Sequence, residues 1–213
     1  MTSVSIIDYG VGNLLSVARA FNYFNADVKF VKTPEEILQA DQLVLPGVGA
    51  FADGMKSLAE LEIIRSIKEF AQTGKPLLGI CLGMQMMLTK SHEFGEYLGL
   101  DLIEGDVVSI PKEDENGKPH NIPHIGWNEL HRPEEGSLWE KTILNGLDRG
   151  SSVYFVHSFM AVPSNPEKRL ADTLYNGQRI CAVFNDKNIY GCQFHPEKSG
   201  EIGLKIIKNF LEL

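Results

Sequence analysis

Gly79-Ile80-Cys81-Leu82-Gly83 is the stretch that decides the fold, because it places a cysteine at a sharp turn between two predicted elements. Residues 75–80 are short, apolar and introduced by proline, which is typical of a buried strand in a parallel sheet. Residues 82–88 have helix-forming side chains at helical spacing. Glycines on both sides allow the chain to turn, so we expect Cys81 in the strained backbone conformation of a nucleophile elbow.

The position of Cys81 suggests chemistry, although a structural interpretation also exists. At such an elbow the sulfur projects from the carboxyl end of the sheet, beside a helix N-terminus whose dipole favours the nucleophilic thiolate. The alternative is a buried structural cysteine, which is the usual role of a free cysteine. The pentapeptide alone does not decide between them, because short motifs produce false positives.

Residues near the C-terminus supply the groups that a cysteine nucleophile needs. Residues 189–194 predict a strand that Pro196 ends, so His195 and Glu197 lie at its exit. A cysteine nucleophile requires a base, and the base requires a third group that orients it. His195 and Glu197 are two residues apart, so both side chains can point the same way along an extended segment. The combination favours a Cys81–His195–Glu197 triad over three unrelated residues.

The order of predicted elements favours one α/β domain over residues 1–213. Strands alternate with helices in the first part of the chain, which predicts a mostly parallel sheet flanked by helices. The predicted strands there are 4–8, 27–32, 42–45 and 75–80, and the helices are 13–24, one capped by Thr33, 54–72 and 82–88. Additional β pieces follow in the C-terminal half at 106–110, 152–157, 169–175, 180–184 and 189–194, before a helix from Ser199.

Composition excludes several classes of partner. The formal net charge of the 213 residues is −8, which argues against nucleic acid or an anionic membrane surface. We find neither a signal peptide nor an apolar run long enough to cross a bilayer. The cysteines at 81, 181 and 192 form neither an even set nor a CxxC metal pattern. We therefore expect a cytoplasmic protein without a metal or other cofactor.

Two motifs carry a resemblance that spans essentially the whole chain. Gly-Ile-Cys-Leu-Gly-Met-Gln at 79–85 and Gln-Phe-His-Pro-Glu-Lys-Ser at 193–199 resemble the triad-type (class I) glutamine amidotransferases. Further segments are similar to the glutaminase subunit of imidazole glycerol phosphate synthase, at residues 8–13, 45–51, 123–128 and 154–158. The resemblance implies hydrolysis of L-glutamine through a cysteine thioester. It also implies a heterodimer in which ammonia reaches a cyclase subunit of (β/α)8 barrel type in histidine biosynthesis.

The loop at 46–49 is a candidate oxyanion hole. It follows a predicted strand of the same sheet, so it should lie near Cys81. Attack on a carboxamide creates a tetrahedral oxyanion that needs backbone N–H donors. The N–H of Leu82 is one candidate, and the resemblance suggests the peptide at Val48 and Gly49 as the second. The alternative is a simple turn, because Pro-Gly pairs commonly mark turns.

The resemblance also implies a site for the amino acid head group of glutamine. Gln85 and Glu93 would face this group, and the main chain at Ser158 and Phe159 would complete the site. Gln85 lies one helical turn after the nucleophile, which supports its place independently. The segment 91–97 is longer than the compact Ser-Glu-Glu-Gly form of the family, so the acidic residue stays open between Glu93 and Glu96. For both, a solvated surface charge is the alternative.

We expect one face to contact the partner. Gly10-x-Gly12 looks like part of a dinucleotide fingerprint, but Leu15 occupies the place of its third glycine, so we interpret this loop as partner-facing. Trp127 could be core or an interface anchor, because large aromatics serve in both roles. His124, His157 and Tyr154 are expected along the ammonia exit. The predicted partner face comprises Tyr9, Gly12, Asn13, Pro123, Trp127 and Asn128.

Other functions remain open from the sequence alone. An amidotransferase subunit of the same lineage could feed ammonia to a related partner in surface polysaccharide synthesis. A non-catalytic assembly protein is disfavoured by the intact triad residues, because a scaffold does not need all three. A freestanding cysteine hydrolase would show glutaminase activity without any partner. The chain contains no part of an acceptor site, so the sequence does not identify the acceptor.

Overall fold

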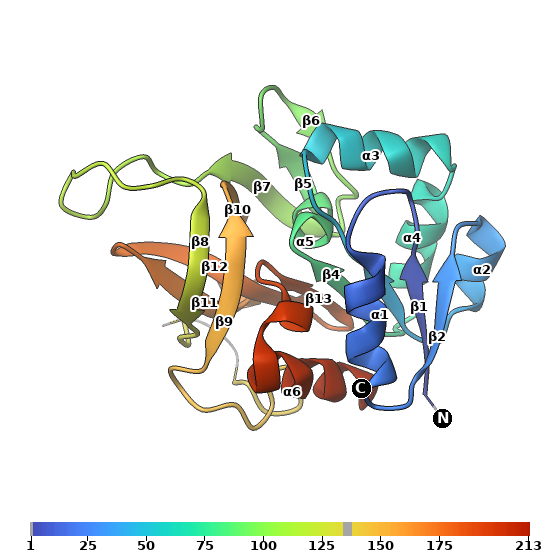
Figure 1. Cartoon of the computed structure of the whole chain (residues 1–213). Helices are drawn as coiled ribbons and strands as arrows, with labels where there is room; N and C mark the ends of the chain where they lie inside the picture. Colours follow the sequence, from blue (N-terminus) through green and yellow to red (C-terminus); the bar gives the residue numbers. More distant parts are fainter. Residues whose placement is uncertain (1, 134–137) are drawn as a thin grey trace.

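The elbow cysteine lies at the end of a central strand of a seven-stranded sheet (Figure 1). The computed structural model describes residues 2–133 and 138–213. The strand order is β11-β12-β13-β4-β3-β1-β2, and the five strands from β13 to β2 are parallel. The predicted mostly parallel sheet is therefore confirmed, with an antiparallel extension at one edge. The strands are β1 (Ser3–Ile7), β2 (Asp27–Val31), β3 (Leu43–Leu45), β4 (Leu77–Ile80), β11 (Arg169–Tyr175), β12 (Gln178–Asp186) and β13 (Ile189–Cys192).

Two smaller sheets supply the remaining β structure. A four-stranded sheet has the order β10-β7-β5-β6, with β5 (Leu88–Ser91), β6 (Tyr97–Leu98), β7 (Ile103–Ser109) and β10 (Phe159–Pro163). An antiparallel pair is formed by β8 (His124–Glu129) and β9 (Ser152–His157). These strands bring the segments around 124 and 157 beside the carboxyl end of the main sheet (Figure 1).

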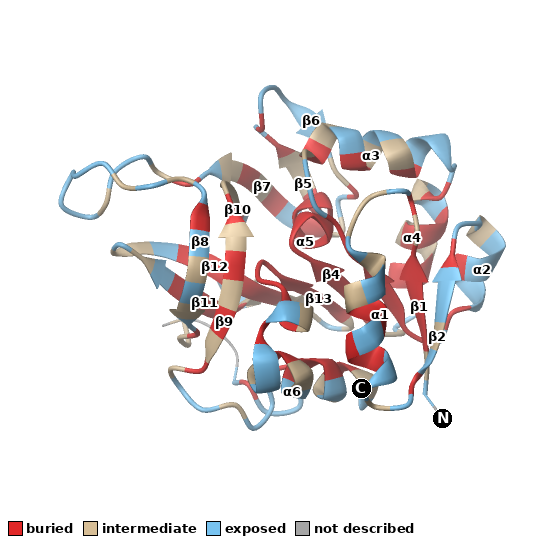
Figure 2. Ribbon diagram, in the orientation of Figure 1, coloured by how far each residue is buried: buried red, intermediate tan, exposed pale blue. Residues whose placement is uncertain are grey.

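Helices cover both faces of the main sheet, as predicted. On one face, α1 (Leu14–Asn22) and α6 (Gly200–Leu211) pack Phe21 and Phe210 against β1. On the other, α2 (Pro34–Gln39), α3 (Phe51–Glu60) and α4 (Ile64–Ala71) bury Ile37, Leu58 and Phe70. The central strands are accordingly buried on both sides (Figure 2). None of the helices within 2–133 and 138–213 has the length and apolar character that crossing a membrane would require.

The local signals at helix ends are confirmed in part. Thr33 caps α2 as predicted and forms a capping box with Glu36, because its side chain accepts from the Glu36 N–H while the Glu36 carboxylate accepts from the Thr33 N–H. The single helix predicted at 54–72 is wrong. The chain breaks at Glu62, whose φ of 57° is left-handed, and continues as α4 on the same face of the sheet. The helix predicted at 82–88 is also too long, since α5 (Leu82–Met86) ends before Leu88 opens β5.

Gly83→Ala is expected to destabilise the fold strongly. A Cβ at residue 83 would overlap the Leu45 carbonyl oxygen, where α5 crosses the end of β3. Overpacking against buried backbone should lower the free energy of unfolding by about 3 kcal/mol. Gly74→Ala is the control for an added methyl group without a clash: no atom lies within 4 Å of its Cβ, so only the backbone strain of its left-handed φ of +80°, about 1 kcal/mol, applies. Equal losses for the two variants in urea unfolding would contradict the steric argument.

Candidate active site

Cys81 has the backbone conformation that the elbow pattern predicts. It follows β4 directly and has φ 54° and ψ −109°, which is a strained region for a residue with a side chain. The surrounding structure holds this conformation. The Cys81 N–H donates to the Cys192 carbonyl at 2.7 Å, which ties the elbow to the end of β13. Gly79 allows the turn to close, because a Cβ there would collide with the backbone of Met84.

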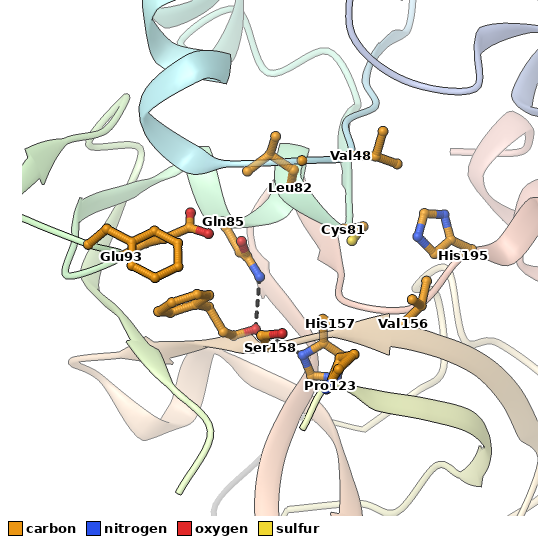
Figure 3. Close-up of a pocket in the computed structure, with 13 residues that line it drawn as sticks. Val48, Cys81, Leu82, Gln85, Glu93, Pro123, Val156, His157, Ser158 and His195 are labelled. Atoms are coloured by element: carbon orange, nitrogen blue, oxygen red, sulfur yellow. Dashed lines mark hydrogen bonds between the residues drawn. The ribbon is translucent and has the colours of Figure 1, made fainter. Parts of the chain in front are cut away.

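His195 and Glu197 follow β13 and form a buried pair beside the elbow. The His195 Nδ1–H donates to the Glu197 Oε1 at 2.8 Å, and both side chains are almost fully buried. The opposite ring nitrogen, Nε2, is buried without a hydrogen-bond partner, and Figure 3 shows the ring beside Cys81. Burial alone would lower the pKa of His195, but its interactions with Cys81 and Glu197 raise the pKa to about 9. His195 therefore holds a proton near neutral pH.

The raised pKa of His195 predicts a loss of stability at alkaline pH. Its folded-state pKa of about 9 lies above the ordinary value of 6.5. The contribution of His195 to the free energy of unfolding is then complete below its unfolded-state pKa and is lost progressively as pH rises from about 6.5 to about 9. Scanning calorimetry between pH 6 and 10 should show the wild type losing its advantage over His195→Asn across this window. A difference in unfolding temperature that stays constant with pH would contradict the assignment.

The loop at 46–49 borders the cavity in front of Cys81, and both of its ends are anchored. The Tyr9 hydroxyl donates to the Pro46 carbonyl at 2.7 Å. The N–H of Phe51, which begins α3, donates to the Glu93 carboxylate at 2.6 Å. Between these points the Leu82 N–H donates to the Gly47 carbonyl at 3.3 Å. One predicted oxyanion donor is therefore engaged by the loop in this structure.

A cavity of about 540 Å³ opens in front of the cysteine, within the usual range for small-molecule sites. Figure 3 shows Cys81 between Gln85 and His195. The Gln85 Nε2 donates to the Phe159 carbonyl at 2.9 Å and to the Gln193 Oε1 at 3.1 Å. The lining residues are Val48, Gly49, Cys81, Leu82, Gln85, Glu93, Phe94, Pro123, Val156, His157, Ser158, Phe159 and His195.

The structure separates the two acidic candidates of the 91–97 segment. Glu93 is buried and lines the cavity, whereas Glu96 is exposed and lies 3.5 Å from the Lys90 ammonium. Phe94 was missed by sequence reasoning. It stands at the cavity wall with 88% exposure and an edge contact to the Phe159 ring, 5.8 Å between centroids. An exposed phenylalanine in a loop carries no periodic signal, so the sequence offered no basis for finding it.

The predicted partner face is exposed in part. Trp127 is 56% exposed, so its core interpretation is wrong, and Trp139 is the buried tryptophan instead. Gly12 is half-buried and Asn13 is exposed, and the Asn13 side chain also caps α1. The structure corrects the prediction for Tyr9. Its side chain is only 4% exposed and supports the oxyanion loop, residues 46–49, instead of reaching the surface.

The other predicted interface residues connect the cavity to the β8–β9 pair. Pro123 is exposed and lines the cavity, while Asn128 is half-buried and donates to the Leu174 carbonyl at 2.8 Å.

Of the residues expected along the ammonia exit, His124 and His157 have ring nitrogens 3.0 Å apart, and only His157 of these two borders the cavity. Burial lowers the pKa of His157 to about 3, so it is neutral. Tyr154 is not among the lining residues and packs its ring edge-on against Trp127.

A strained cysteine above a parallel sheet, with a buried His–Glu pair and an open cavity, defines a triad enzyme of the cysteine type. The family described as "Glutamine amidotransferase class-I" matches residues 5–213. The chain belongs to the class-I glutamine amidotransferases and, within them, to the HisH subunits of imidazole glycerol phosphate synthase.

The relatives match over their full length. The chain is 68% identical to "Imidazole glycerol phosphate synthase subunit HisH 1" of Legionella pneumophila (strain Paris), with 100% of both chains covered. It is 45% identical to the HisH subunit of Methanosarcina acetivorans, again with 100% of both covered. Among solved structures, PurLQS from Thermotoga maritima has a TM-score of 0.71 at 18% identity, covering 100% of this chain and 99% of that one. The last likeness shows the fold alone.

Proposed function

We propose that this chain hydrolyses L-glutamine to glutamate and ammonia through a thioester on Cys81. The ammonia then passes to a cyclase subunit that makes imidazole glycerol phosphate in histidine biosynthesis. The observation that carries this proposal is the Cys81–His195–Glu197 arrangement beside the cavity that Cys81 and His195 line. The names of the full-length HisH relatives supply the pathway. They do not favour the alternative in surface polysaccharide synthesis.

The triad accounts for both halves of the reaction. The Cys81 thiolate attacks the carboxamide carbon, and the oxyanion accepts hydrogen bonds from Leu82 and from the Val48–Gly49 peptide. His195 gives its proton to the leaving nitrogen, which departs as ammonia and leaves the thioester. His195 then takes a proton from water, and the resulting hydroxide attacks the thioester carbon. Collapse of this second intermediate expels the thiolate and releases glutamate. Glu197 keeps the ring oriented through the bond to Nδ1.

The head group of glutamine would bind at the far end of the cavity. Both N–H groups of the Gln85 amide are used by protein acceptors, so its Oε1 is left to accept from the α-ammonium. The buried carboxylate of Glu93 supplies a negative charge for the same α-ammonium group. The main chain of Ser158 and Phe159, at the start of β10, completes the site. The carboxamide would then lie toward Cys81.

The cyclase partner is expected to be a (β/α)8 barrel that binds this chain as a heterodimer. The predicted interface is Gly12, Asn13, Pro123, Trp127 and Asn128, at the carboxyl edge of the sheet. Ile125 joins it, because it is 58% exposed on β8 beside Trp127. Exposed apolar side chains grouped near an active site commonly mark a protein interface. A thiolate catalyst also suits a reducing compartment such as the cytoplasm.

Treatment with 6-diazo-5-oxonorleucine, an electrophilic glutamine analogue, tests the assignment of the nucleophile. One label per chain should appear on Cys81 in peptide mass spectrometry, and excess glutamine should slow the labelling. Cys181 and Cys192 are the internal controls, because both are free and fully buried. A label that settles on either of these, or labelling that glutamine does not slow, would contradict the proposal.

A further inference from the structure

We propose that Gln193 is a positioning residue for the nucleophile: its amide N–H holds the Cys81 thiolate and links it to the head-group site through Gln85. The inference rests on the proposed glutaminase function and adds a role for a residue outside the triad. Gln193 immediately follows β13 and precedes His195 by two residues. Its side chain is fully buried.

Gln193 makes one contact to each functional neighbour. Its Nε2 donates to the Cys81 Sγ at 3.9 Å, a distance suited to the larger radius of sulfur. Its Oε1 accepts from the Gln85 Nε2 at 3.1 Å. Its backbone N–H donates to the Ala182 carbonyl at 2.9 Å, which ties the residue to β12. The side chain therefore bridges the nucleophile and the residue that we assign to the head group.

Hydrogen-bond bookkeeping fixes which way the Gln193 amide points. The Phe159 carbonyl can only accept, so Gln85 must direct its NH2 group toward Phe159, and the second N–H reaches Gln193. Gln193 must then present its oxygen to Gln85 and its NH2 group to Cys81. The opposite orientation would place two NH2 groups against each other and a carbonyl oxygen against the thiolate. The Phe159 carbonyl in β10 therefore determines, through Gln85, that Gln193 presents an N–H donor to the sulfur.

Two consequences follow for the reaction. A donor at the sulfur stabilises the thiolate and restrains its position, because hydrogen bonds to charged groups are stronger than neutral ones. Glutamine that bonds to the free Oε1 of Gln85 would also polarise the chain from Gln85 through Gln193 to Cys81. Loss of Gln193 should therefore lower both the reactivity of the thiol and the affinity for glutamine.

Alkylation of Cys81 by iodoacetamide as a function of pH tests this role in the full-length chain. Gln193→Met keeps the length of the side chain and removes the donor. Its alkylation near pH 7 should be about tenfold slower than in the wild type, with the pH midpoint about one unit higher. Gln193→Glu keeps the acceptor for Gln85 but faces the sulfur with a carboxylate, so it should be slower still. Gln42→Met is the matched control, since Gln42 is also buried but bonds to the Phe210 carbonyl.

The readout separates positioning from packing. If the alkylation profile of Gln193→Met coincides with that of the wild type, Gln193 only packs, and the proposal is overturned. If that variant does not fold, Gln193→Asn gives the same comparison, because its shorter amide keeps a polar group but does not reach the sulfur. The alkylation assay uses neither glutamine nor the partner. A failed glutamine-protection experiment would thus count against the proposed function and not against this contact.

Discussion

Cys81→Ala is expected to abolish glutamine hydrolysis while leaving the ammonia-dependent reaction of the cyclase partner intact. Removing the nucleophile of a triad enzyme lowers kcat by about 10⁶-fold, because the residues act as a unit. In the proposed heterodimer the acceptor site belongs to the cyclase, so externally supplied ammonium salt should still be used. Two measurements on the heterodimer check this: glutamate release from glutamine, and imidazole glycerol phosphate formation from ammonium chloride.

Matched variants make this prediction specific. Cys181→Ala removes another fully buried cysteine that does not line the cavity, so it should retain glutaminase activity. Glu197→Gln should be milder than His195→Ala, because the orienting member of a triad usually contributes less than the base. Substantial glutamate release by Cys81→Ala would refute the nucleophile assignment.

The second large effect concerns the partner: the isolated chain should be a poor glutaminase that the cyclase activates about 10²- to 10³-fold. Leu82 donates its N–H to the Gly47 carbonyl in this structure, so one oxyanion donor is engaged before substrate arrives. Loss of one such donor costs roughly 2.7–4 kcal/mol of transition-state stabilisation. Glutamine turnover should be measured with and without the purified cyclase and its acceptor ligand. Full activity of the isolated chain would support the freestanding hydrolase instead.

A comparison of two exposed aromatic residues tests where the activating contact lies. Trp127→Ala should weaken activation by the cyclase, because Trp127 stands on the predicted interface with 56% exposure. Tyr23→Ala is the control: Tyr23 is 68% exposed but follows the far end of α1, away from the carboxyl edge of the sheet. If both variants are activated like the wild type, the predicted interface is wrong.

The parts of this molecule that the sequence predicts are those encoded locally. The Cys81 elbow, the His195–Glu197 spacing and the Thr33 capping box each depend on residues within a few positions of one another. The break at Glu62 was missed because α3 and α4 both turn apolar residues toward the same face, so the helical period continues across it. Strands β8 and β10 were missed for a different reason, since they pair with β9 and β7, which lie far away along the chain. Strands β5 and β6 were missed although they pair with each other across a short connection.

Side chains that act across the fold were the hardest to predict. The motif at residues 8–13 predicts Tyr9 on the partner face, yet Tyr9 is buried and its hydroxyl donates to the Pro46 carbonyl. Gln193 sits inside a recognised motif, but its contact to Gln85 joins residues 108 positions apart. Burial of a polar group depends on tertiary packing, and one sequence does not reveal which neighbours satisfy it.

The two anchors of the oxyanion loop determine what kind of motion can switch the enzyme on. Tyr9 fixes the carbonyl of Pro46 and Glu93 fixes the N–H of Phe51, so a reorientation is confined to the peptide units between them, where the Gly47 carbonyl accepts from Leu82. A segment pinned at both ends can reorient by a crankshaft rotation, in which one peptide plane turns while the chain on either side stays in place. Such a rotation displaces only a few atoms, whereas lid closure moves a whole segment. The active and inactive forms should therefore superpose closely everywhere except in the peptide units between Pro46 and Phe51.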